Sequence, residues 1–356
     1  MTKVIAIYLP QFHEIEENNK WHGKGHTEWV ACKKAGPLFK GHNQPRIPMN
    51  NNYYNLLDEE AQIEQVRLAK EYNIYGFCYY HYWFKGKQLL ENPMENMLKN
   101  SKIDLPFCIS WANHTWSSGP SIKQRKTLIE QTYGERDDWV LHFNYLLQFF
   151  KDDRYIKVNG KPMMVIYDVK DIPCWIEMKS VWEELAMEAG FDGLHYVNTL
   201  KHEIDVEFSN QYNFDAQFEY QPTFALGKSK KFDYAKYYNT KRILCKDLLG
   251  IPCKVNYDKV WKEIFEKTPS NGIPTYLGSY NDWDTTARWG KNGIVHLGAN
   301  PEKFEQYFGT QVKRSNKNNS DFIFITAWNE WSEGAYLEPD EKNKFGYLEA
   351  IKRCLS

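Results

Sequence analysis

An excess of charge of one sign is the first thing that the chain of 356 residues lacks. Lys and Arg together number 45 and Asp and Glu number 46, and the longest basic run is Lys228-Ser-Lys-Lys231. A surface that attracts nucleic acid, or a whole molecule drawn to anionic lipid, needs a positive field that this balance does not supply. We therefore expect no nucleic-acid partner.

Long apolar runs and an ordered pattern of cysteines are also missing. The chain contains no stretch of about 18 apolar residues, the length needed to span a bilayer. The apolar segment Val4–Leu9 is too short for a secretory signal peptide. The seven cysteines contain no Cys-x-x-Cys motif and have no regular spacing, which argues against a disulfide framework or a zinc cluster. These absences predict a reduced, cytoplasmic protein without a membrane span.

Motifs for the common cofactors and nucleophiles are absent as well. No Gly-x-Gly-x-x-Gly turn, Walker loop, His-Glu-x-x-His motif or Gly-x-Ser-x-Gly elbow occurs. His22 and His26 are four residues apart, but they flank glycines in a predicted loop and have no further ligand nearby. Asp282 and Asp284 alone are weak evidence for a divalent ion. We expect neither a metal nor a cofactor.

Aromatic residues, by contrast, are abundant: 13 Trp, 24 Tyr and 20 Phe make up 16% of the chain. Many of them stand beside polar residues, as in Tyr79-Tyr-His-Tyr-Trp83 and Trp111-Ala-Asn-His-Thr-Trp116. Rings with one apolar and one polar side suit sites where a ligand stacks on a ring and also forms hydrogen bonds.

The order of apolar and amphipathic segments predicts the fold. Short apolar runs, typical of buried strands, alternate with segments of helical periodicity. This pattern predicts one (β/α)₈ TIM barrel domain over residues 1–356, with long loops at the C-terminal face of the strands. A doubly wound sheet is the alternative, but its glycine-rich phosphate turn is missing.

The predicted elements are as follows. Strands are expected at 4–9, 75–80, 107–111, 163–167, 194–199, 215–218 and 275–280, with the eighth beginning at Phe322. Helices are expected at 58–73, 89–100, 135–150, 175–189, 257–267, 301–313 and 347–355. Irregular loops are expected at 10–57 and 221–250, and only a short connection between the fifth and sixth strands.

The eighth strand leads into the stretch that we expect to carry the chemistry. Trp328, Asn329, Glu330, Trp331 and Glu333 follow its apolar run directly. Burial and a nearby like charge both raise carboxylate pKa values, so such a pair can be divided into one neutral acid and one ionised base. The alternative interpretation is a pair of surface glutamates that form salt bridges with lysines. The flanking indoles favour the first interpretation, because a sugar ring packs on such faces.

In a barrel the C-terminal ends of the strands converge on one site. The side chains expected there are carboxylates, amides, imidazoles and aromatic rings, without a thiolate or a serine triad, which is typical of a sugar-binding site. Glu330 and Glu333 are the predicted catalytic residues. The predicted substrate-binding residues are Tyr8, Gln11, His13, Trp21, Glu28, Trp29, Tyr80, His81, Tyr82, Trp83, Trp111, Asn113, Trp116, Tyr280, Asp284, Trp328 and Asn329.

Several motifs together resemble those of one family. They are Thr27-Glu28-Trp29, Gly76-Phe-Cys-Tyr-Tyr-His-Tyr-Trp-Phe84, Trp111-Ala-Asn113, Trp283-Asp-Thr-Thr-Ala-Arg288, Ala327-Trp-Asn-Glu-Trp-Ser-Glu-Gly334 and Leu337-Glu-Pro-Asp340. On these motifs the chain resembles the WbsX-type proteins, which accompany surface-polysaccharide (O-antigen and capsule) assembly and are commonly labelled glycosyltransferases. It is similar through them to glycoside hydrolase family 99, the endo-α-mannosidases, which are (β/α)₈ barrels.

The resemblance also implies roles for matching residues. The first Glu of the strand-eight motif acts on the sugar 2-hydroxyl as a base, and the sugar then displaces its own leaving group through a 1,2-anhydro intermediate with net retention. This role falls to Glu330, and Glu333 becomes the general acid that later activates water. His114 stands where many WbsX-type sequences have an acidic residue.

Three functions follow as hypotheses. The first is a retaining glycosidase or transglycosylase that acts on an α-linked, mannose-type oligo- or polysaccharide. The second is a glycosyltransferase that builds a surface polysaccharide from an activated donor. The third is a carbohydrate-binding protein without catalysis. The sequence leaves the sugar, the linkage and the oligomeric state open, because fold does not determine function.

Overall fold

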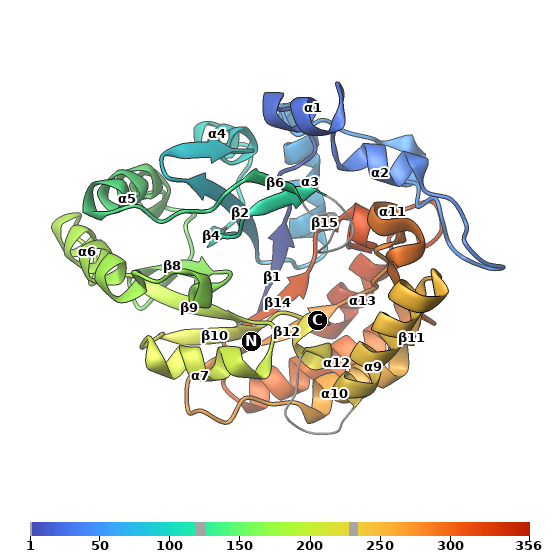
Figure 1. Ribbon diagram of the computed structural model, residues 1–356. Coiled ribbons are helices and arrows are strands. Elements are labelled where there is room, and N and C mark those ends of the chain that lie inside the picture. Colours follow the sequence, from blue (N-terminus) through green and yellow to red (C-terminus); the bar gives the residue numbers. More distant parts are fainter. Residues whose placement is uncertain (1, 119–125, 228–233) are drawn as a thin grey trace.

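The computed structural model describes residues 2–118, 126–227 and 234–356 of the chain, so the basic run at 228–231 lies outside the described residues. Within these ranges eight parallel strands form a closed barrel, because the sheet runs β1-β14-β12-β10-β9-β8-β4-β2 and β2 pairs again with β1 (Figure 1). The strands are β1 (Lys3–Tyr8), β2 (Gly76–Phe84), β4 (Phe107–Trp111), β8 (Lys161–Ile166), β9 (His195–Leu200), β10 (Ala216–Glu219), β12 (Thr275–Tyr280) and β14 (Phe322–Thr326). The predicted barrel is confirmed.

Register shows how tightly the barrel closes. Ile5 of β1 lies opposite Phe324 of β14 on one side and opposite Gly76 of β2 on the other. A side chain at position 76 would collide with the carbonyl oxygen of Pro106, which instead accepts a hydrogen bond from the amide of Phe77 at 3.0 Å. Glycine is therefore required where β2 begins.

Helices surround the barrel, one or more after each strand (Figure 1). Those that pack on the strands are α3 (Glu59–Glu71), α4 (Asn92–Lys99), α5 (Arg136–Phe150), α6 (Trp175–Glu188), α7 (Glu203–Gln211), α10 (Tyr257–Glu266), α12 (Pro301–Lys317) and α13 (Gly346–Leu355). Their buried faces and the strands share one core, in which Trp182, Trp261 and Phe308 are fully covered. None of the helices in the described ranges is both long enough and apolar enough to cross a membrane.

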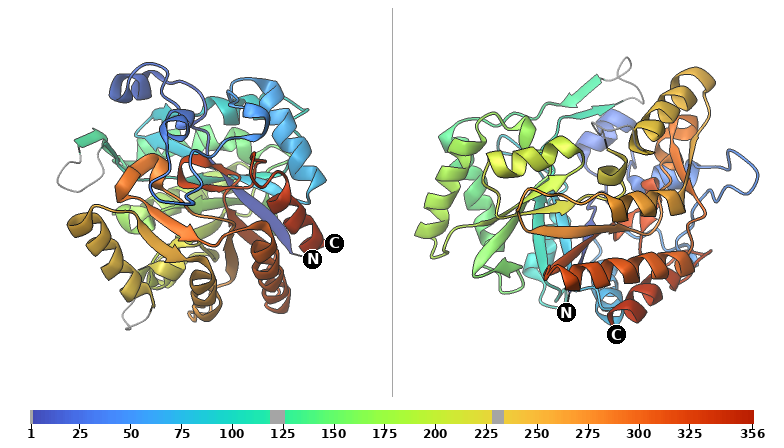
Figure 2. Two further views of the ribbon diagram at one scale, coloured as in Figure 1. Left: turned by 90° about the vertical axis from the view of Figure 1, so that its right-hand side faces the viewer. Right: turned by 90° about the horizontal axis from the view of Figure 1, so that it is seen from below.

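The remaining elements lie in the connections. They are α1 (Glu16–His22), α2 (Glu28–Lys34), η1 (Met49–Asn51), β3 (Lys87–Leu89), β5 (Trp116–Ser118), β6 (Lys126–Ile129), β7 (Lys157–Val158), η3 (Val169–Asp171), α8 (Thr223–Leu226), α9 (Tyr234–Ile243), the π-helical turn η4 (Leu244–Leu249), β11 (Cys253–Asn256), α11 (Thr286–Trp289), η5 (Gly290–Asn292), β13 (Ile294–Leu297), β15 (Asn329–Glu330), η6 (Trp331–Glu333) and β16 (Ala335–Tyr336). Both chain termini lie at one end of the barrel, and the β5–β6 hairpin and α9 lie at the opposite end (Figure 2).

Several predicted boundaries were wrong. The supposed loop at 10–57 contains α1 and α2, the supposed loop at 221–250 contains α8, α9 and η4, and α7 fills the connection between the fifth and sixth strands. The helix expected at 89–100 begins at Asn92, because Leu89 and its neighbours pair with β2 as β3. Short helices such as these carry little periodic signal, and contacts with the rest of the barrel stabilise them.

Candidate active site

One arginine gathers three carboxylates at the C-terminal end of the barrel. The Nη1 atom of Arg288 lies 2.5 Å from Oε1 of Glu333, and its Nη2 atom lies 2.8 Å from Oε1 of Glu28. The same Nη2 atom is 3.7 Å from Oε2 of Glu330. The glutamate side chains are 6% (Glu28), 8% (Glu330) and 18% (Glu333) exposed, so this is a nearly buried ionic cluster.

Local hydrogen bonds hold the arginine in this position. The carboxylate of Asp284 accepts hydrogen bonds from the amide (3.0 Å) and the hydroxyl (2.6 Å) of Thr286, at the start of α11, which carries Arg288. The amide of Asp284 donates to the carbonyl of Glu333 at 2.7 Å. Ser332 accepts from Nε of Arg288 at 3.0 Å. The turn after β14 and helix α11 are thus joined to each other.

The pKa values of the two candidate catalytic glutamates are both raised. Burial raises the pKa of Glu330 well above its usual range, and the charge of Glu333 adds to this effect, whereas Arg288 opposes it. Burial also raises the pKa of Glu333, against the lowering effect of the Arg288 charge and hydrogen bond. In this arrangement a shared proton is favoured on Glu330, because Glu333 makes the shorter ion pair with the arginine.

Tyrosines from three strands form the wall beside these glutamates. Tyr80 and Tyr82 project from β2, and burial and the charge of Glu330 both raise their pKa values. Tyr167 follows β8 and Tyr220 follows β10, and the hydroxyl of Tyr80 donates to that of Tyr220 at 3.1 Å. The glutamates therefore face aromatic rings that carry hydroxyl groups.

A second charged group lies against Tyr167. Nζ of Lys201, the residue after β9, is 2.7 Å from Oδ2 of Asp168 and 3.9 Å from the centre of the Tyr167 ring. Lys170 lies 2.8 Å from Oδ1 of the same aspartate. The exposed ring of His114 is 5.6 Å from the ring of Tyr167. An ion pair and an aromatic ring thus continue the site beyond the glutamates.

The rim contains further predicted residues. The rings of Trp21 and Trp116 are 6.0 Å apart, and Trp116 packs edge-on against Tyr82 at 5.0 Å. The carbonyl of Gln11 accepts a hydrogen bond from the amide of Glu28 at 3.1 Å, which ties β1 to α2. His13 is buried, and neither of its ring nitrogens has a hydrogen-bond partner among the described residues. Burial lowers the His13 pKa to about 4.

Two predicted residues on β2 face away from the glutamates. Nε2 of His81 lies 2.9 Å from Nε2 of His142 on α5, and Trp83 stacks on the His142 ring at 4.5 Å. Burial lowers the pKa of His81 to about 3. Because side chains alternate along a strand, the residues that flank Tyr82 pack against the helix layer instead of lining the barrel.

Three more predicted residues also pack against helices. Trp111 lies 4.8 Å from the His142 ring, and Tyr280 stacks on Trp261 of α10 at 5.5 Å. The hydroxyl of Tyr8 donates to Gln65 of α3 at 2.6 Å. The expectation that these strand-end residues converge with the glutamates was wrong, since each stands at a helix-facing position of its strand.

Two asparagines act as matched backbone clamps. Asn113 accepts from the amide of Asp168 at 2.9 Å and donates to its carbonyl at 2.8 Å. Asn329 accepts from the amide of Leu9 at 2.8 Å and donates to its carbonyl at 3.0 Å. With both amide groups engaged, these side chains fix the ends of neighbouring strands and are not available to a ligand.

Two predicted tryptophans support the strand-eight turn from behind. Trp29 packs on Trp331 at 5.3 Å, and Trp328 packs on Phe77 at 4.9 Å. The indole of Trp331 donates to the buried carboxyl of Glu338 at 2.6 Å. Glu338 also accepts hydrogen bonds from Gln65 at 2.7 Å and Tyr54 at 2.9 Å, so this carboxyl supports the turn and is distinct from the cluster at Arg288. Burial raises its pKa to about 7.

Asp284, another predicted sugar contact, is held by a histidine and an arginine. It lies 2.9 Å from Nε2 of His42 and 3.6 Å from Arg46, which also pairs with Asp282 at 2.8 Å. Burial acts to raise the pKa of Asp284, but the His42 hydrogen bond and the Arg46 charge lower it below its usual range. These aspartates neutralise an arginine, and no group of three metal-ligating side chains occurs among the residues described.

Sequence reasoning missed Arg288 and Lys201 as site residues. Arg288 ends the motif that begins at Trp283 and also contains Asp284, a predicted site residue. A cationic residue in the same motif as a predicted carboxylate was the signal that could have identified it. Lys201 directly follows an apolar strand. Arg288 pairs with Glu28 and Lys201 pairs with Asp168. The two residues of each pair are far apart in sequence, so only the folded barrel brings them together.

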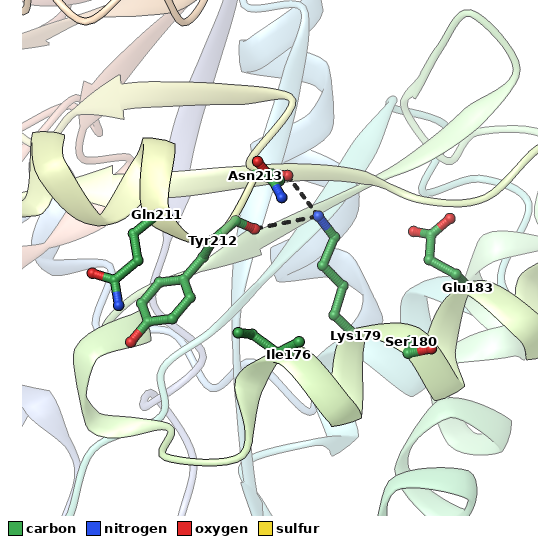
Figure 3. Close-up of a pocket in the computed structure, with 7 residues that line it drawn as sticks. All are labelled: Ile176, Lys179, Ser180, Glu183, Gln211, Tyr212 and Asn213. Atoms are coloured by element: carbon green, nitrogen blue, oxygen red, sulfur yellow. Dashed lines mark hydrogen bonds between the residues drawn. The ribbon is translucent and has the colours of Figure 1, made fainter.

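A hollow of about 280 Å³ lies away from this cluster, between α6 and α7 (Figure 3). Its one lysine, Lys179, donates to the carbonyls of Asn213 at 2.5 Å and Tyr212 at 3.4 Å. Because this lysine is already bound to the backbone, the hollow offers little to a substrate. The candidate site is therefore identified by its charges and not by this hollow.

Comparison with known proteins was made for the whole chain. Residues 4–351 match the sequence model of a family described as Glycosyltransferase WbsX. Proteins described as uncharacterized protein WxcX, from two strains of Xanthomonas campestris pv. campestris, are 31% identical over 361 residues. This alignment covers 99% of the chain and 49% of each relative, so the chain spans about half the length of the curated relatives it matches.

Solved structures share the barrel. The GH99 endo-alpha-mannosidase from Bacteroides thetaiotaomicron has a TM-score of 0.59 at 13% identity, over 99% of this chain and 96% of that one. Its complex with BIS-TRIS-Propane has a TM-score of 0.57 at 14% identity, over 99% and 95%. A glycoside hydrolase-like protein has a TM-score of 0.59 at 11% identity, over 99% and 93%. At these identities the likeness concerns the fold.

Proposed function

The chain belongs to the Glycosyltransferase WbsX family, and on that premise we propose that it is a carbohydrate-active enzyme that reacts at the anomeric carbon of a sugar. The reaction proposed is retaining glycoside cleavage or transglycosylation on an α-linked, mannose-type oligo- or polysaccharide. One observation carries this proposal: Glu330 and Glu333 share one guanidinium in a nearly buried site, with raised pKa values.

The proposed reaction assigns one proton transfer to each glutamate. Glu330 takes the proton of the 2-hydroxyl, O2 attacks C1, and the bond to the leaving oxygen breaks as Glu333 protonates that oxygen. Glu333, now ionised, activates a water or a sugar hydroxyl that attacks C1 and opens the 1,2-anhydro ring. Glu330 returns its proton to O2, and the configuration at C1 is retained.

The electrostatics of Glu330 and Glu333 favour the opposite assignment of acid and base. The short Arg288 ion pair favours an ionised Glu333, which suits a base, and leaves Glu330 as the proton holder. We keep the assignment implied by the family motif, and the reversed roles are its direct alternative. Leaving-group dependence separates them, because loss of the acid harms poor leaving groups more than good ones.

The proposed substrate fits the wall of the site. Tyr80, Tyr82, Tyr167 and Tyr220 present rings and hydroxyl groups, which suits the C–H faces and O–H groups of sugars. The Asp168–Lys201 pair offers a charged acceptor and donor beyond them. The preference for an α-mannose-type linkage is supported by the motif resemblance and by the similarity of the barrel to GH99 endo-alpha-mannosidases.

A glycosyltransferase that uses an activated donor is the second candidate, and the name of the family favours it. The local charge argues against a nucleotide diphosphate at the cluster, because three carboxylates surround one guanidinium there. A diphosphate would add like charge to this group. The third candidate, sugar binding without catalysis, requires that the raised glutamate pKa values serve no reaction.

Incubation with α-mannan fragments and activated aryl α-glycosides, with and without nucleotide-sugars, tests these functions. Turnover without a nucleotide supports the first candidate, and strict nucleotide dependence supports the second. Binding without turnover that Glu333→Gln leaves unchanged supports the third. For the first candidate, Glu333→Gln should lose most activity on poor leaving groups and less on good ones, whereas Glu330→Gln should lose activity on both. The opposite pattern would reverse the two roles.

A further inference from the structure

Aliphatic side chains are exposed together where α9 passes into η4. We call Ile243, Leu244, Leu248, Leu249 and Ile251 the apolar patch. Their exposed fractions range from 46% to 75%, and Leu248 is the most exposed. Single exposed apolar residues are ordinary, but five within residues 243–251 form a contiguous surface that needs an explanation.

Helical geometry brings these side chains to one side. The residues of η4 form a π-helical turn, so positions four and five apart lie nearly above one another, as Leu244 and Leu248 or Ile243 and Leu248 do. Cys245 is buried within the same turn. Gly250 ends the turn with a φ of 59°, a left-handed conformation that favours glycine, and the chain then presents Ile251.

Basic residues surround the apolar patch, although the whole chain is nearly neutral. Between positions 234 and 254 the sequence has five basic residues and one acidic residue, namely Lys236, Lys241, Arg242, Lys246, Lys254 and Asp247. Lys236, Arg242 and Lys254 are exposed. The balance of 45 basic and 46 acidic residues therefore conceals one positively charged segment.

The segment lies at the functional end of the molecule. Helix α9 follows β10 through α8, and the views of Figure 2 show it at the same end as the β5–β6 hairpin, opposite the chain termini. Trp116 of that hairpin packs on Tyr82 in the wall of the candidate site. A surface that docks on the apolar patch thus approaches the rim of the barrel mouth.

We propose that the apolar patch and its basic border dock on the surface of a bilayer that contains anionic lipid. Aliphatic side chains beside lysine and arginine suit the boundary between acyl chains and anionic headgroups. A second copy of the chain is a poorer occupant, because it would bring two positively charged segments together. The inference is independent of the reaction at Glu330 and Glu333.

Vesicle sedimentation of the full chain tests the proposal. We expect the protein to sediment with vesicles of equimolar phosphatidylcholine and phosphatidylglycerol and not with phosphatidylcholine alone. Leu248→Glu should lower the partition coefficient about tenfold or more, because it removes a leucine that would enter the bilayer surface and adds a charge that anionic lipid repels. Arg242→Gln should lower it about fivefold. Both side chains are exposed, so neither change disturbs the core.

Met187→Glu is the matched control, because Met187 is 60% exposed on α6, outside the patch. The partition coefficient of the Met187→Glu variant should equal that of the unchanged protein. The proposal is overturned if the unchanged protein stays in solution with anionic vesicles, or if Leu248→Glu and Met187→Glu sediment alike. A dimer in analytical ultracentrifugation that Leu248→Glu abolishes, without vesicle binding, also overturns it and assigns the patch to a second copy.

Discussion

At the scale of single residues, Arg288 governs the chemistry of the candidate site. Its guanidinium touches Glu333 and Glu28 directly and lies near Glu330, and so it lowers the cost of holding three carboxylates in a nearly buried place. Without it, burial would raise the pKa values of Glu330 and Glu333 further. The arginine therefore determines which glutamate is ionised.

Substitution of this arginine should move the pH profile. In Arg288→Ala the pKa values of Glu330 and Glu333 should rise further, because the cation that lowers them is gone. The acidic limb of the kcat/KM profile should therefore shift to higher pH. Arg288→Lys keeps the positive charge but loses the planar guanidinium that contacts several carboxylates at once, so it should shift the acidic limb less. An unmoved limb in Arg288→Ala would contradict the proposed role of the ionic cluster.

Lys201 should matter more for long substrates than for short ones. It is paired with Asp168 and lies over the ring of Tyr167, and we expect a second sugar unit of a longer substrate to contact this pair. Lys201→Ala should reduce kcat/KM for oligosaccharides roughly tenfold to a hundredfold, the loss expected for a charged hydrogen bond. The loss on aryl glycosides should be smaller.

Lys179→Ala provides the control for this comparison, because Lys179 binds backbone carbonyls between α6 and α7. Its kinetics should be unchanged on both substrates. Equal losses on long and short substrates in Lys201→Ala would assign the lysine to the glutamate site or to the fold instead.

At the scale of elements, the mouth of the barrel is built from short pieces held by ionic contacts. Helix α11 has only four residues and owes its position to Asp284, which binds Thr286, His42 and the turn at Glu333. A helix this short does not form alone. The orientation of Arg288 therefore depends on Asp284.

Removal of the Asp284 charge should loosen this arrangement. Asp284→Asn should lower the free energy of unfolding by roughly 1–3 kcal/mol, because the buried hydrogen bonds that the charged carboxylate accepts become weaker bonds to a neutral amide. It should also reduce kcat, since Arg288 and Glu333 lose a common support. Urea unfolding and steady-state kinetics measure the two effects.

Glu64→Gln is the matched control, because Glu64 pairs with Arg67 on an exposed face of α3. An exposed pair contributes only about 0–1 kcal/mol, so this variant should be nearly unchanged in stability and activity. If Asp284→Asn resembles Glu64→Gln in both measurements, the assigned role of Asp284 is wrong.

The element scale also shows what a strand pattern can predict. Side chains alternate between the two faces of β2, so its residues divide into two sets that can be read from the sequence. It does not say which set faces the barrel, because both are aromatic or apolar on a strand that is buried throughout. The position of α5, with His142 against His81 and Trp83, resolved that choice.

At the scale of the whole molecule, buried carboxyl groups make stability depend on pH. Glu219 at the end of β10 is fully buried, accepts a hydrogen bond from the amide of Gly278 at 3.3 Å, and faces away from the Arg288 cluster. Burial raises its pKa to about 7. The folded protein therefore keeps a proton on Glu219 over a range in which the unfolded chain has lost it.

The sign of the effect follows from linkage. Between the ordinary glutamate pKa of about 4.3 and the raised value, the folded state binds more protons, so stability falls as pH rises through this window. Glu219→Gln should reduce this slope, to which Glu338 with its similarly raised pKa also contributes, and raise the free energy of unfolding at alkaline pH by up to about 3 kcal/mol. Urea unfolding at several pH values measures it. A variant that keeps the slope undiminished would show that Glu219 does not contribute to it.

The (β/α)₈ architecture was predictable from the sequence, because buried parallel strands appear as short apolar runs between amphipathic helices. The candidate glutamates were predictable too, since both lie in one unusual strand-end motif, and the single-domain assignment of residues 1–356 stays a prediction. Contacts between distant segments were not predictable: Arg288 with Glu28, Lys201 with Asp168, and the clamps of Asn113 and Asn329. Local sequence sets periodicity and burial, whereas barrel closure alone decides which distant side chains meet and hence where charge is stabilised.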